Sequence, residues 1–382
     1  MKIVCDSNMP YAAEAFGTLG AVVLRDGRAI TAADVRDADL LITRSTTRVT
    51  RELLAGSRLR FYGSAVIGTD HIDIPYLEQA GIPWSAAPGC NAESVSNYLT
   101  AALLYLGGRH GFQLEGKTVG VIGVGNVGRK VVAKAQALGL RVLACDPPRK
   151  RDASDTAARE FIALEELLAA SDIITCHVPL MRDGPDRTWH MLDRAALSLL
   201  RPGAIVVNAA RGEVLRTDAL LEVLGSRVAH AVIDTWAGEP NYRADLLARA
   251  DIVSPHIAGH AYEGKVNGTM MVYEKACQVL GVVPDFRLQL PPPPLPEWSG
   301  DAAGRPDEDV LRDAVLAVYD IMADDRRLRA SCGTDAAARA KAFDRQRKEY
   351  PMRREFAATT VRLRNASAAL RQKFRELGFR AG

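Results

Sequence analysis

The chain has 382 residues, of which 48% are hydrophobic and 25% charged, and it contains no apolar run long enough to span a bilayer. Its formal net charge of +3 is too small to indicate nucleic-acid binding, and its six cysteines form no CxxC pair, so we expect reduced thiols and no metal site. The N-terminus begins as a strand, Met-Lys-Ile-Val-Cys-Asp, without a secretory signal, which predicts a soluble, cytoplasmic protein of two or three domains with no membrane partner.

The first 95 residues alternate short apolar runs with segments of helical spacing. The apolar runs lie at residues 2–6, 21–25, 38–43, 60–66 and 83–87, and one helical segment extends from Ile72 to Gln79 before the stop signal of Gly81. This alternation predicts a parallel sheet with helices on both faces. A longer helix, from about Ala92 to Leu106, is expected to follow.

A second series of apolar runs follows that helix. It comprises residues 118–122, 141–145, 172–178, 204–209, 230–234 and 251–254, and one more helix is predicted from Glu263 to Leu280. The predicted class is therefore α/β, with two Rossmann-like or flavodoxin-like, doubly wound parallel-sheet domains. We assign residues 1–95 to the first domain, completed by a returning helix at about 263–285, and residues 96–262 to the second.

The run Leu-Pro-Pro-Pro-Pro-Leu-Pro at residues 290–296 interrupts the chain, because successive prolines favour an extended conformation. It predicts a semi-rigid linker at 286–304, in preference to a binding motif for SH3-type domains. Residues 305–382 are expected to form a small C-terminal α+β unit, with a helix at Asp307–Met322 and Arg-rich helical segments beyond it.

The C-terminal unit contains no catalytic constellation. From residue 301 onward there are 18 Lys and Arg against 13 Asp and Glu, which we interpret as solvated helix faces rather than a polyanion site. A unit of roughly 75 residues with few aromatic residues has a marginal core of its own. We therefore expect its apolar helix faces to pair with a second copy, giving a homodimer.

The clearest chemical signal is a glycine-rich turn directly after the apolar run at 118–122. Gly123, Gly125 and Gly128 form a GxGxxG motif, and a strand that ends in such a turn and opens a helix can bind a pyrophosphate. Asp146 ends the next apolar run, 18 residues after Gly128, where a carboxylate can accept both hydroxyls of an adenosine ribose. This favours NAD as the cofactor, although the basic residues at 149–151 weaken the preference over NADP.

Three polar residues follow later apolar runs, where an open α/β sheet places its ligands. Arg211 offers a planar fork that matches a substrate carboxylate. His256 can accept the hydroxyl proton as a hydride leaves, and Glu239 can bond the other imidazole nitrogen and fix its tautomer. Singly, each has an ordinary structural alternative, namely a surface arginine, a helix-capping glutamate and a buried histidine. Their order after a dinucleotide motif favours oxidation of a 2-hydroxy acid.

On these residues the sequence resembles the D-isomer-specific 2-hydroxyacid dehydrogenases, whose order of Arg, Glu and His is matched by Arg211, Glu239 and His256. His177-Val-Pro-Leu180 matches a further family segment, and the resemblance covers about residues 1–285. Strings such as Asn8-Met-Pro10 match one branch, whose members act on a small phosphorylated 2-hydroxy acid and carry a C-terminal dimerisation domain. The resemblance implies cofactor contacts at Gly123, Gly125, Asn126, Val127, Gly128, Asp146, Thr175, Asp234 and Gly259.

Substrate contacts are implied at Arg44, Ser45, Val66 and His260. The segment Arg44-Ser-Thr-Thr-Arg48 could present guanidinium groups and hydroxyls to a phosphate, or it could be an ordinary polar loop. Two positions depart from the family, which has Tyr where this chain has His260 and commonly Thr where it has Val66. Two alternatives therefore stay open, namely a dehydrogenase for another 2-hydroxy acid, such as phosphoglycerate or hydroxypyruvate, and an NAD(H)-sensing scaffold without turnover.

Overall fold

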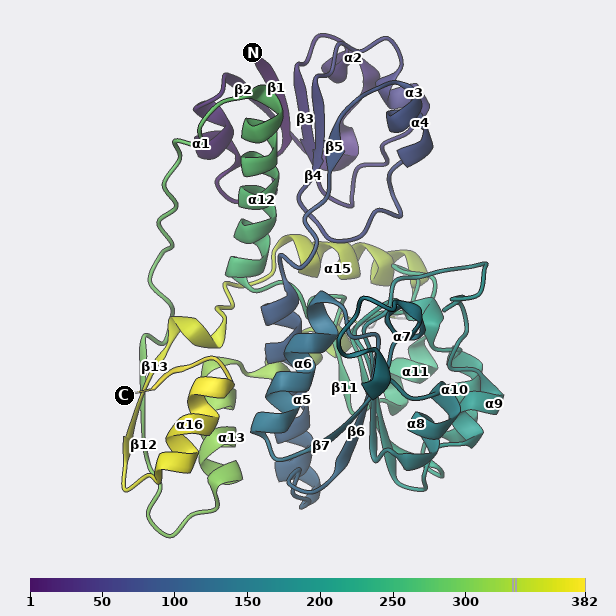
Figure 1. The fold of residues 1–382 in the computed structure, drawn as a ribbon, viewed down its shortest axis with the longest axis vertical. Coiled ribbons are helices and arrows are strands. Elements are labelled where there is room, and N and C mark those ends of the chain that lie inside the picture. Colours follow the sequence, from purple (N-terminus) through teal and green to yellow (C-terminus); the bar gives the residue numbers. More distant parts are fainter. Residues whose placement is uncertain (332, 334, 382) are drawn as a thin grey trace. The chain divides into compact units, whose positions relative to one another are not determined.

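The computed structural model describes residues 1–331, 333 and 335–381, and it divides the chain into two compact units (Figure 1). The first unit combines Met1–Ala92 with His260–Pro291, and the second combines Glu93–Gly259 with Pro292–Gly382. Each unit is therefore built from two separate stretches of the chain. Both contain parallel sheets with helices, so the predicted α/β class is confirmed.

The first unit contains a five-stranded parallel sheet in the order β2-β1-β3-β4-β5, which is the flavodoxin-like order. Its strands are β1 (Lys2–Asp6), β2 (Ala21–Arg25), β3 (Leu40–Thr43), β4 (Phe61–Ser64) and β5 (Trp84–Ser85). Its helices are α1 (Ala12–Gly17), α2 (Ala32–Val35), α3 (Arg51–Leu54), α4 (Ile74–Gln79) and α12 (Tyr262–Leu280), with a 3-10 turn at Gly27–Ala29.

The helix α12 returns from the second stretch of the chain and packs closely on strand β4. A Cβ atom on Gly63 of β4 would lie 2.1 Å from Cγ1 of Val272, and one on Gly268 of α12 would lie 2.3 Å from the carbonyl oxygen of Ala65. Both contacts are possible only for glycine, since real Cβ atoms do not approach this closely. The expected return of this helix to the first unit is therefore what the structure shows.

The second unit is built on a six-stranded parallel sheet in the order β11-β10-β9-β8-β6-β7. Its strands are β6 (Thr118–Ile122), β7 (Arg141–Cys145), β8 (Ile173–Cys176), β9 (Ala204–Asn208), β10 (Val228–Ile233) and β11 (Ile252–Val253). The helices are α5 (Ala92–His110), α6 (Asn126–Ala137), α7 (Pro147–Arg151), α8 (Leu164–Ala170), α9 (Arg194–Ser198), α10 (Thr217–Val223) and α11 (Ala244–Arg249), with 3-10 turns at Ala158–Glu160 and Gly212–Val214.

The C-terminal segment adds a three-stranded parallel sheet and four helices to this unit. The strands are β12 (Glu297–Asp301), β13 (Thr360–Arg364) and β14 (Arg380–Ala381), in the order β12-β13-β14. The helices are α13 (Asp307–Val318), α14 (Ile321–Ala330), α15 (Ala336–Lys348) and α16 (Ala368–Glu376), with a 3-10 turn at Phe356–Ala358. The strand β12 lies inside the expected linker 286–304, and the expected helix Asp307–Met322 is interrupted after Val318.

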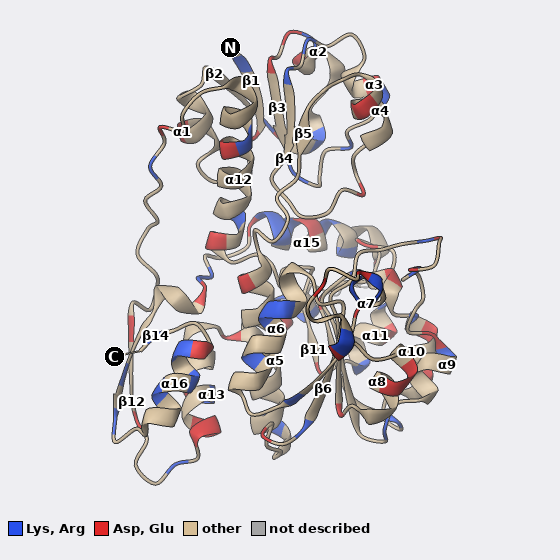
Figure 2. Ribbon diagram, viewed as in Figure 1, with Lys and Arg blue, Asp and Glu red and all other residues tan. Residues whose placement is uncertain are grey.

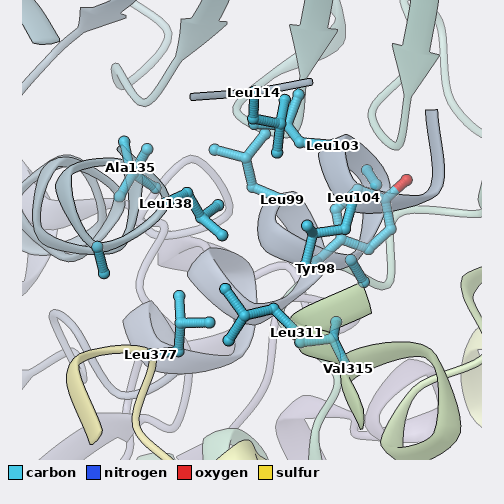
Figure 3. Close-up of a cluster of buried hydrophobic side chains, with 14 of the residues drawn as sticks. Tyr98, Leu99, Leu103, Leu104, Leu114, Ala135, Leu138, Leu311, Val315 and Leu377 are labelled. Atoms are coloured by element: carbon cyan, nitrogen blue, oxygen red, sulfur yellow. The ribbon is translucent and has the colours of Figure 1, made fainter. Parts of the chain in front are cut away.

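The second unit has a continuous core that joins the C-terminal segment to the nucleotide-binding part of the sequence. Figure 3 shows Tyr98 and Leu104 of α5 on the side nearer to Leu311 and Val315 of α13, whereas Leu103 lies beside Leu114. The helix α5 is buried on nearly every side, because the sheet covers one face and the C-terminal segment another. The apolar faces of the tail helices are therefore covered in part by the same chain, where we expected a second copy to cover them.

Charged residues are interspersed over the helices of both units (Figure 2). In the C-terminal segment, α13 begins with three acidic residues, whereas α14, α15 and α16 each end with basic ones. The positive excess of the tail is thus distributed over several helices, and some of its arginines pair with neighbouring carboxylates, as Arg305 does with Asp313. Among the described residues, no helix is both long and apolar enough to cross a membrane.

Candidate active site

The predicted site residues of the second unit follow strands that are neighbours in its sheet. Arg211 follows β9, Glu239 follows β10 and His256 follows β11, while the glycine turn and Asp146 follow β6 and β7. Since all six strands are parallel, these residues lie at one edge of the sheet. The strand order reverses between β6 and β8, and ligands of open α/β sheets bind at such a reversal.

The glycine turn has the geometry of a dinucleotide site. Gly123 has a φ of +84°, which favours glycine, and a Cβ atom on Gly128 would lie 2.0 Å from the Gly123 carbonyl oxygen. A Cβ atom on Gly125 would meet no atom within 4 Å. Two of the glycines are thus required by the close packing of β6 on α6, and the third leaves space beside the N-terminus of a 12-residue helix. That combination fits a pyrophosphate.

Asp146 connects the end of β7 to the glycine turn. Its Oδ2 accepts a hydrogen bond from the amide of Val124 at 2.8 Å, and its Oδ1 accepts one from the amide of Arg149 at 3.1 Å. The Arg149 guanidinium pairs with Asp155 and donates to the carbonyl of Val124 at 2.7 Å. The first basic residue of the 149–151 cluster is therefore held by the protein itself, which removes part of the argument for NADP.

Thr175 ends β8 and contacts the histidine of the His177-Val-Pro-Leu180 segment. Oγ1 of Thr175 lies 3.0 Å from Nε2 of His177, and burial lowers the pKa of this histidine to about 3. Its Nδ1 is buried and has no hydrogen-bond partner within the described residues. His177 is therefore neutral at working pH and unsuited to act as a general base.

Glu239 and His256 form the pair that the sequence predicted. Oε2 of Glu239 lies 2.8 Å from Nδ1 of His256, and Oε1 accepts from the amide of Trp236 at 2.8 Å. Burial opposes ionisation of Glu239, but His256, Arg347 and the Trp236 amide outweigh it and hold the pKa of Glu239 below its usual range. A carboxylate on Nδ1 leaves Nε2 of His256 as the nitrogen that can accept a proton.

The backbone around His256 is held by the buried carboxylate of Asp234. This carboxylate accepts from the amides of Ile257 at 2.7 Å and Ala258 at 3.1 Å, and from the hydroxyl of Ser254 at 2.6 Å. Burial raises the pKa of Asp234. His256 itself has a φ of +55°, a left-handed conformation that is unusual for a side chain other than glycine. The surrounding hydrogen bonds therefore fix a segment that has an intrinsic backbone strain.

Arg211 lies on a turn that packs directly against the Trp236 segment. A Cβ atom on Gly212 would lie 1.9 Å from the carbonyl carbon of Trp236, so glycine is required beside the arginine. Nη1 of Arg211 donates to the carbonyl of Ala210 at 2.9 Å, and the Asn208 side chain donates to the carbonyl of Arg211 at 3.0 Å. Gly212 was not predicted, because its importance comes from this contact with the distant Trp236 backbone.

The predicted substrate residues Arg44, Ser45, Val66 and His260 all belong to the first unit. Arg44 and Ser45 follow β3, Val66 follows β4, and His260 precedes α12. The carboxyl ends of β3 and β4 lie at the same edge of the parallel sheet, so the first three residues share that edge.

The polar loop after β3 uses part of its hydrogen-bonding capacity internally. Oγ1 of Thr47 donates to the carbonyl of Gly27 at 2.8 Å, and Oγ1 of Thr46 donates to Asp6 at 3.3 Å. These threonines support the loop conformation, and Ser45 is exposed beside them. A phosphate site in this loop would therefore depend on Arg44, Ser45 and main-chain groups more than on the two threonine hydroxyls.

Comparisons with known proteins agree with this geometry. Residues 105–258 match the family described as D-isomer specific 2-hydroxyacid dehydrogenase, NAD binding domain, and residues 289–378 match a Domain of unknown function (DUF3410). Among solved structures, the chain is similar to the TT0316 protein of Thermus thermophilus, with a TM-score of 0.63 and 26% identity over 74% of this chain and 98% of that one. The fold also matches an NAD⁺-bound 3-phosphoglycerate dehydrogenase of Entamoeba histolytica, with a TM-score of 0.62 and 24% identity over 74% of this chain and 95% of that one.

Curated relatives match the chain over its whole length. The erythronate-4-phosphate dehydrogenase of Cronobacter sakazakii is 45% identical over 100% of this chain and 98% of its own length. The enzyme of the same name from Edwardsiella ictaluri is 47% identical over 94% of each chain. These matches include the C-terminal segment, which the similarity to the solved structures above does not cover in full. The chain therefore belongs to the erythronate-4-phosphate dehydrogenase family.

Proposed function

We propose that the chain catalyses the NAD-dependent oxidation of 4-phospho-D-erythronate at C2, giving 2-oxo-3-hydroxy-4-phosphobutanoate and NADH, a step in the biosynthesis of pyridoxal 5′-phosphate. The observation that carries this proposal is the 2.8 Å contact between Glu239 and His256 at strand ends beside Arg211, in a chain that matches named erythronate-4-phosphate dehydrogenases over its whole length. Substrate identity rests on those relatives, and reaction type rests on the site.

In the proposed reaction, His256 is the general base. Its Nε2 accepts the proton of the C2 hydroxyl while the C2 hydrogen leaves as a hydride and the carbon–oxygen double bond forms. Glu239 holds the Nδ1–H tautomer and stabilises the imidazolium that results. When bound at the glycine turn and Asp146, NAD would supply the hydride acceptor for this step.

Arg211 is proposed to bind the substrate carboxylate. Its planar guanidinium can make two parallel hydrogen bonds, which would orient C2 for hydride transfer. Gly212 lets this turn approach the Trp236 backbone, and the amide of Trp236 bonds Glu239. The carboxylate-binding group and the base are therefore held by segments that touch each other, which supports a shared function.

The cofactor site is proposed to comprise Gly123, Gly125, Asn126, Val127, Gly128, Asp146, Thr175, Asp234 and Gly259. The space beside Gly125 and the dipole of α6 would accommodate the pyrophosphate, and the Asp146 carboxylate would bond the adenosine ribose. A 2′-phosphate would meet the negative charge of Asp146, so we propose NAD in preference to NADP.

The first unit is proposed to bind the substrate phosphate through Arg44 and Ser45. Val66 and His260 are proposed as further substrate contacts. His260 can donate a hydrogen bond, whereas Val66 cannot, so these two positions bear on which 2-hydroxy acid is used. We further propose a cytoplasmic homodimer in which residues 1–95 and 263–285 bind substrate, 96–262 bind NAD, and 305–382 contribute to the dimer contact.

The test is NADH formation, followed by absorbance, with 4-phosphoerythronate, 3-phosphoglycerate and glycerate in parallel, each with NAD and with NADP. We expect the highest kcat/KM with 4-phosphoerythronate and NAD. A preference for phosphoglycerate would move the substrate assignment to another member of the wider family. Binding of NAD without turnover of any 2-hydroxy acid would contradict the enzymatic proposal. Separately, unchanged NAD binding in Arg211→Lys would support a role of Arg211 at the substrate.

A further inference from the structure

The C-terminal segment contacts both ends of the backbone segment that contains His256. The amide of Val253, three residues before the histidine, donates to Oδ1 of Asp325 on α14 at 2.9 Å. The carbonyl of Ala258, two residues after it, accepts a hydrogen bond from Nη2 of Arg353. Two residues that are remote in sequence therefore hold the two sides of the histidine segment, within a single chain.

Arg353 is a buried, charged side chain that packing of the core alone would not require. Its side chain is buried, and its guanidinium lies 4.5 Å from the ring centre of Tyr319 and 5.8 Å from that of Tyr350. Both tyrosine hydroxyls donate to Oδ2 of Asp324, at 2.6 and 2.8 Å, which places a carboxylate near the buried cation. Nη1 of Arg353 has no hydrogen-bond partner within the described residues.

A buried cation with an unsatisfied donor is a poor way to stabilise a fold, because desolvation costs more than one carbonyl contact returns. A fixed guanidinium is, however, an effective way to hold a carbonyl in one position, because the aromatic rings restrict its movement. The Ala258 carbonyl belongs to the same segment whose amides are bound by Asp234. The amides that follow His256 are therefore held by Asp234 at the end of β10, and the carbonyl of Ala258 is held by the tail.

The helix α15 makes a second contact, on the Glu239 side of the pair. The ring of Phe343 is fully buried, and its centre lies 5.7 Å from the ring centre of Tyr242. The ring centre of Tyr242 in turn lies 5.1 Å from that of Trp236. The amide of Trp236 bonds Glu239, and the positive charge of Arg347 contributes to lowering the pKa of this carboxyl. The tail thus packs behind the orienting carboxylate as well as around the base.

We propose that Arg353, Asp325 and Phe343 of the C-terminal segment are positioning residues for the Glu239–His256 pair of the same chain. The inference rests on the proposed role of His256 as the base, and it gives the C-terminal segment a catalytic task in addition to assembly. His256 has a left-handed backbone conformation that its surroundings must maintain. The tail supplies contacts on both sides of that residue, so loss of one contact should displace the imidazole while the glycine turn of the NAD site remains intact.

The experiment compares Arg353→Met, Arg353→Lys and the control Arg364→Met, in the full-length protein. Arg364 lies on β13 with its side chain 82% exposed, so its replacement tests loss of a tail arginine without loss of the Ala258 contact. We expect Arg353→Met to lower kcat by about 10- to 100-fold, because small displacements of a catalytic group cost this much. Its KM for NAD and its oligomeric state should stay close to those of the parent, and its acid limb in the pH–rate profile should move.

Arg353→Lys should recover part of kcat, since a lysine can still donate to the Ala258 carbonyl. A parent-like kcat and pH–rate profile in folded Arg353→Met would overturn the proposal, as would a kcat loss that is explained by dissociation alone. If Arg353→Met does not fold, Phe343→Leu keeps an apolar side chain at the second contact and should still lower kcat. A folded Phe343→Leu protein with parent-like kcat and pH profile would then count against the proposal.

Amide hydrogen exchange gives a readout that does not require activity. We expect peptides that cover residues 253–258 to exchange faster in Arg353→Met than in the parent and in Arg364→Met, whereas peptides from β6 and α6 stay unchanged. Uniformly faster exchange would indicate a structural role only and overturn the proposal. A fully active His256→Asn enzyme would contradict the proposed function, and this outcome is separate from the exchange result.

Discussion

Replacing Glu239 with Gln is the sharpest test of the paired base, because it keeps the size of the side chain and removes only its charge. In the structure Oε1 accepts from the Trp236 amide and Oε2 faces Nδ1 of His256. The Trp236 amide can bond only an oxygen, so the glutamine must turn its NH₂ group toward Nδ1. Nδ1 then becomes the acceptor, and the proton moves to Nε2.

Two effects follow, and each has a magnitude. A neutral imidazole that carries its proton on Nε2 cannot accept one there, and a wrong tautomer of this kind costs up to about 10⁴-fold in kcat. The lost charge acts separately. Opposite charges about 4 Å apart interact by about 4 kcal/mol at an effective dielectric constant of 20.

The charge effect must be reduced because the His256 and Glu239 side chains are 31% and 21% exposed. Solvent screening leaves about 1–2 kcal/mol. The interaction with His256 that helps to lower the pKa of Glu239 is the one that Glu239→Gln removes. Without the carboxylate, the imidazolium that forms when His256 accepts the substrate proton loses this stabilisation, which costs about a further 10-fold in rate, and the pH–rate profile should change.

The assay is kcat/KM for the 2-hydroxy acid as a function of pH, with NAD affinity measured in parallel by fluorescence. Glu213→Gln is the matched control, because Glu213 accepts from the amide of Gly238 at 3.4 Å and replacing it removes a carboxylate from the same region. We expect a loss of about 10²- to 10⁴-fold in Glu239→Gln and less than about 3-fold in the control. Retention of more than a tenth of the activity with an unchanged pH–rate profile would refute the pairing.

Four further substitutions test the base, the carboxylate site and the cofactor turn. His256→Asn should lower kcat by about 10²- to 10⁴-fold at nearly unchanged NAD affinity, and an active variant would remove His256 from the mechanism. Arg211→Lys should lower kcat/KM far more than NAD binding, because lysine cannot make the two-point contact, and equal losses would instead assign Arg211 to the cofactor. Gly128→Ala should lower both the melting temperature and NAD affinity, since its Cβ would meet the Gly123 carbonyl at 2.0 Å, whereas Gly125→Ala should weaken NAD binding at an unchanged melting temperature. Calorimetry of the free proteins separates the two alanine variants, and identical melting behaviour would contradict this division of roles.

The sequence predicted the two large sheets well because their strands are continuous apolar runs. The strand Thr118–Ile122 is buried at every position, and such runs are typical of strands covered on both faces. The strand Glu297–Asp301 was missed because most of its residues are polar and it directly follows the proline-rich run at 290–296. It exists because it pairs with Thr360–Arg364, a partner about sixty residues away that no local pattern can reveal.

The candidate site was predictable to the extent that each residue follows its own strand. Arg211, Glu239 and His256 could be named from their positions, and parallel neighbouring strands bring them to one edge. Gly212 and Arg353 could not, because their importance comes from contacts with distant backbone, at Trp236 and Ala258. For the same reason, the packing of the C-terminal segment on α5 was not predicted, since a sequence shows apolar helix faces but not which surface covers them.

The buried Lys134 on α6 has a consequence for how the protein is made. Its ammonium group donates to the Asn97 side chain and, at 2.8 Å, to the carbonyl of Leu377, and it pairs with Glu93. Leu377 is synthesised 243 residues after Lys134, so a nascent nucleotide-binding unit has to hold this lysine without its final acceptor until then. The first unit also waits for its helix at Tyr262–Leu280. Each unit can therefore complete its fold only after its second stretch of chain has been synthesised.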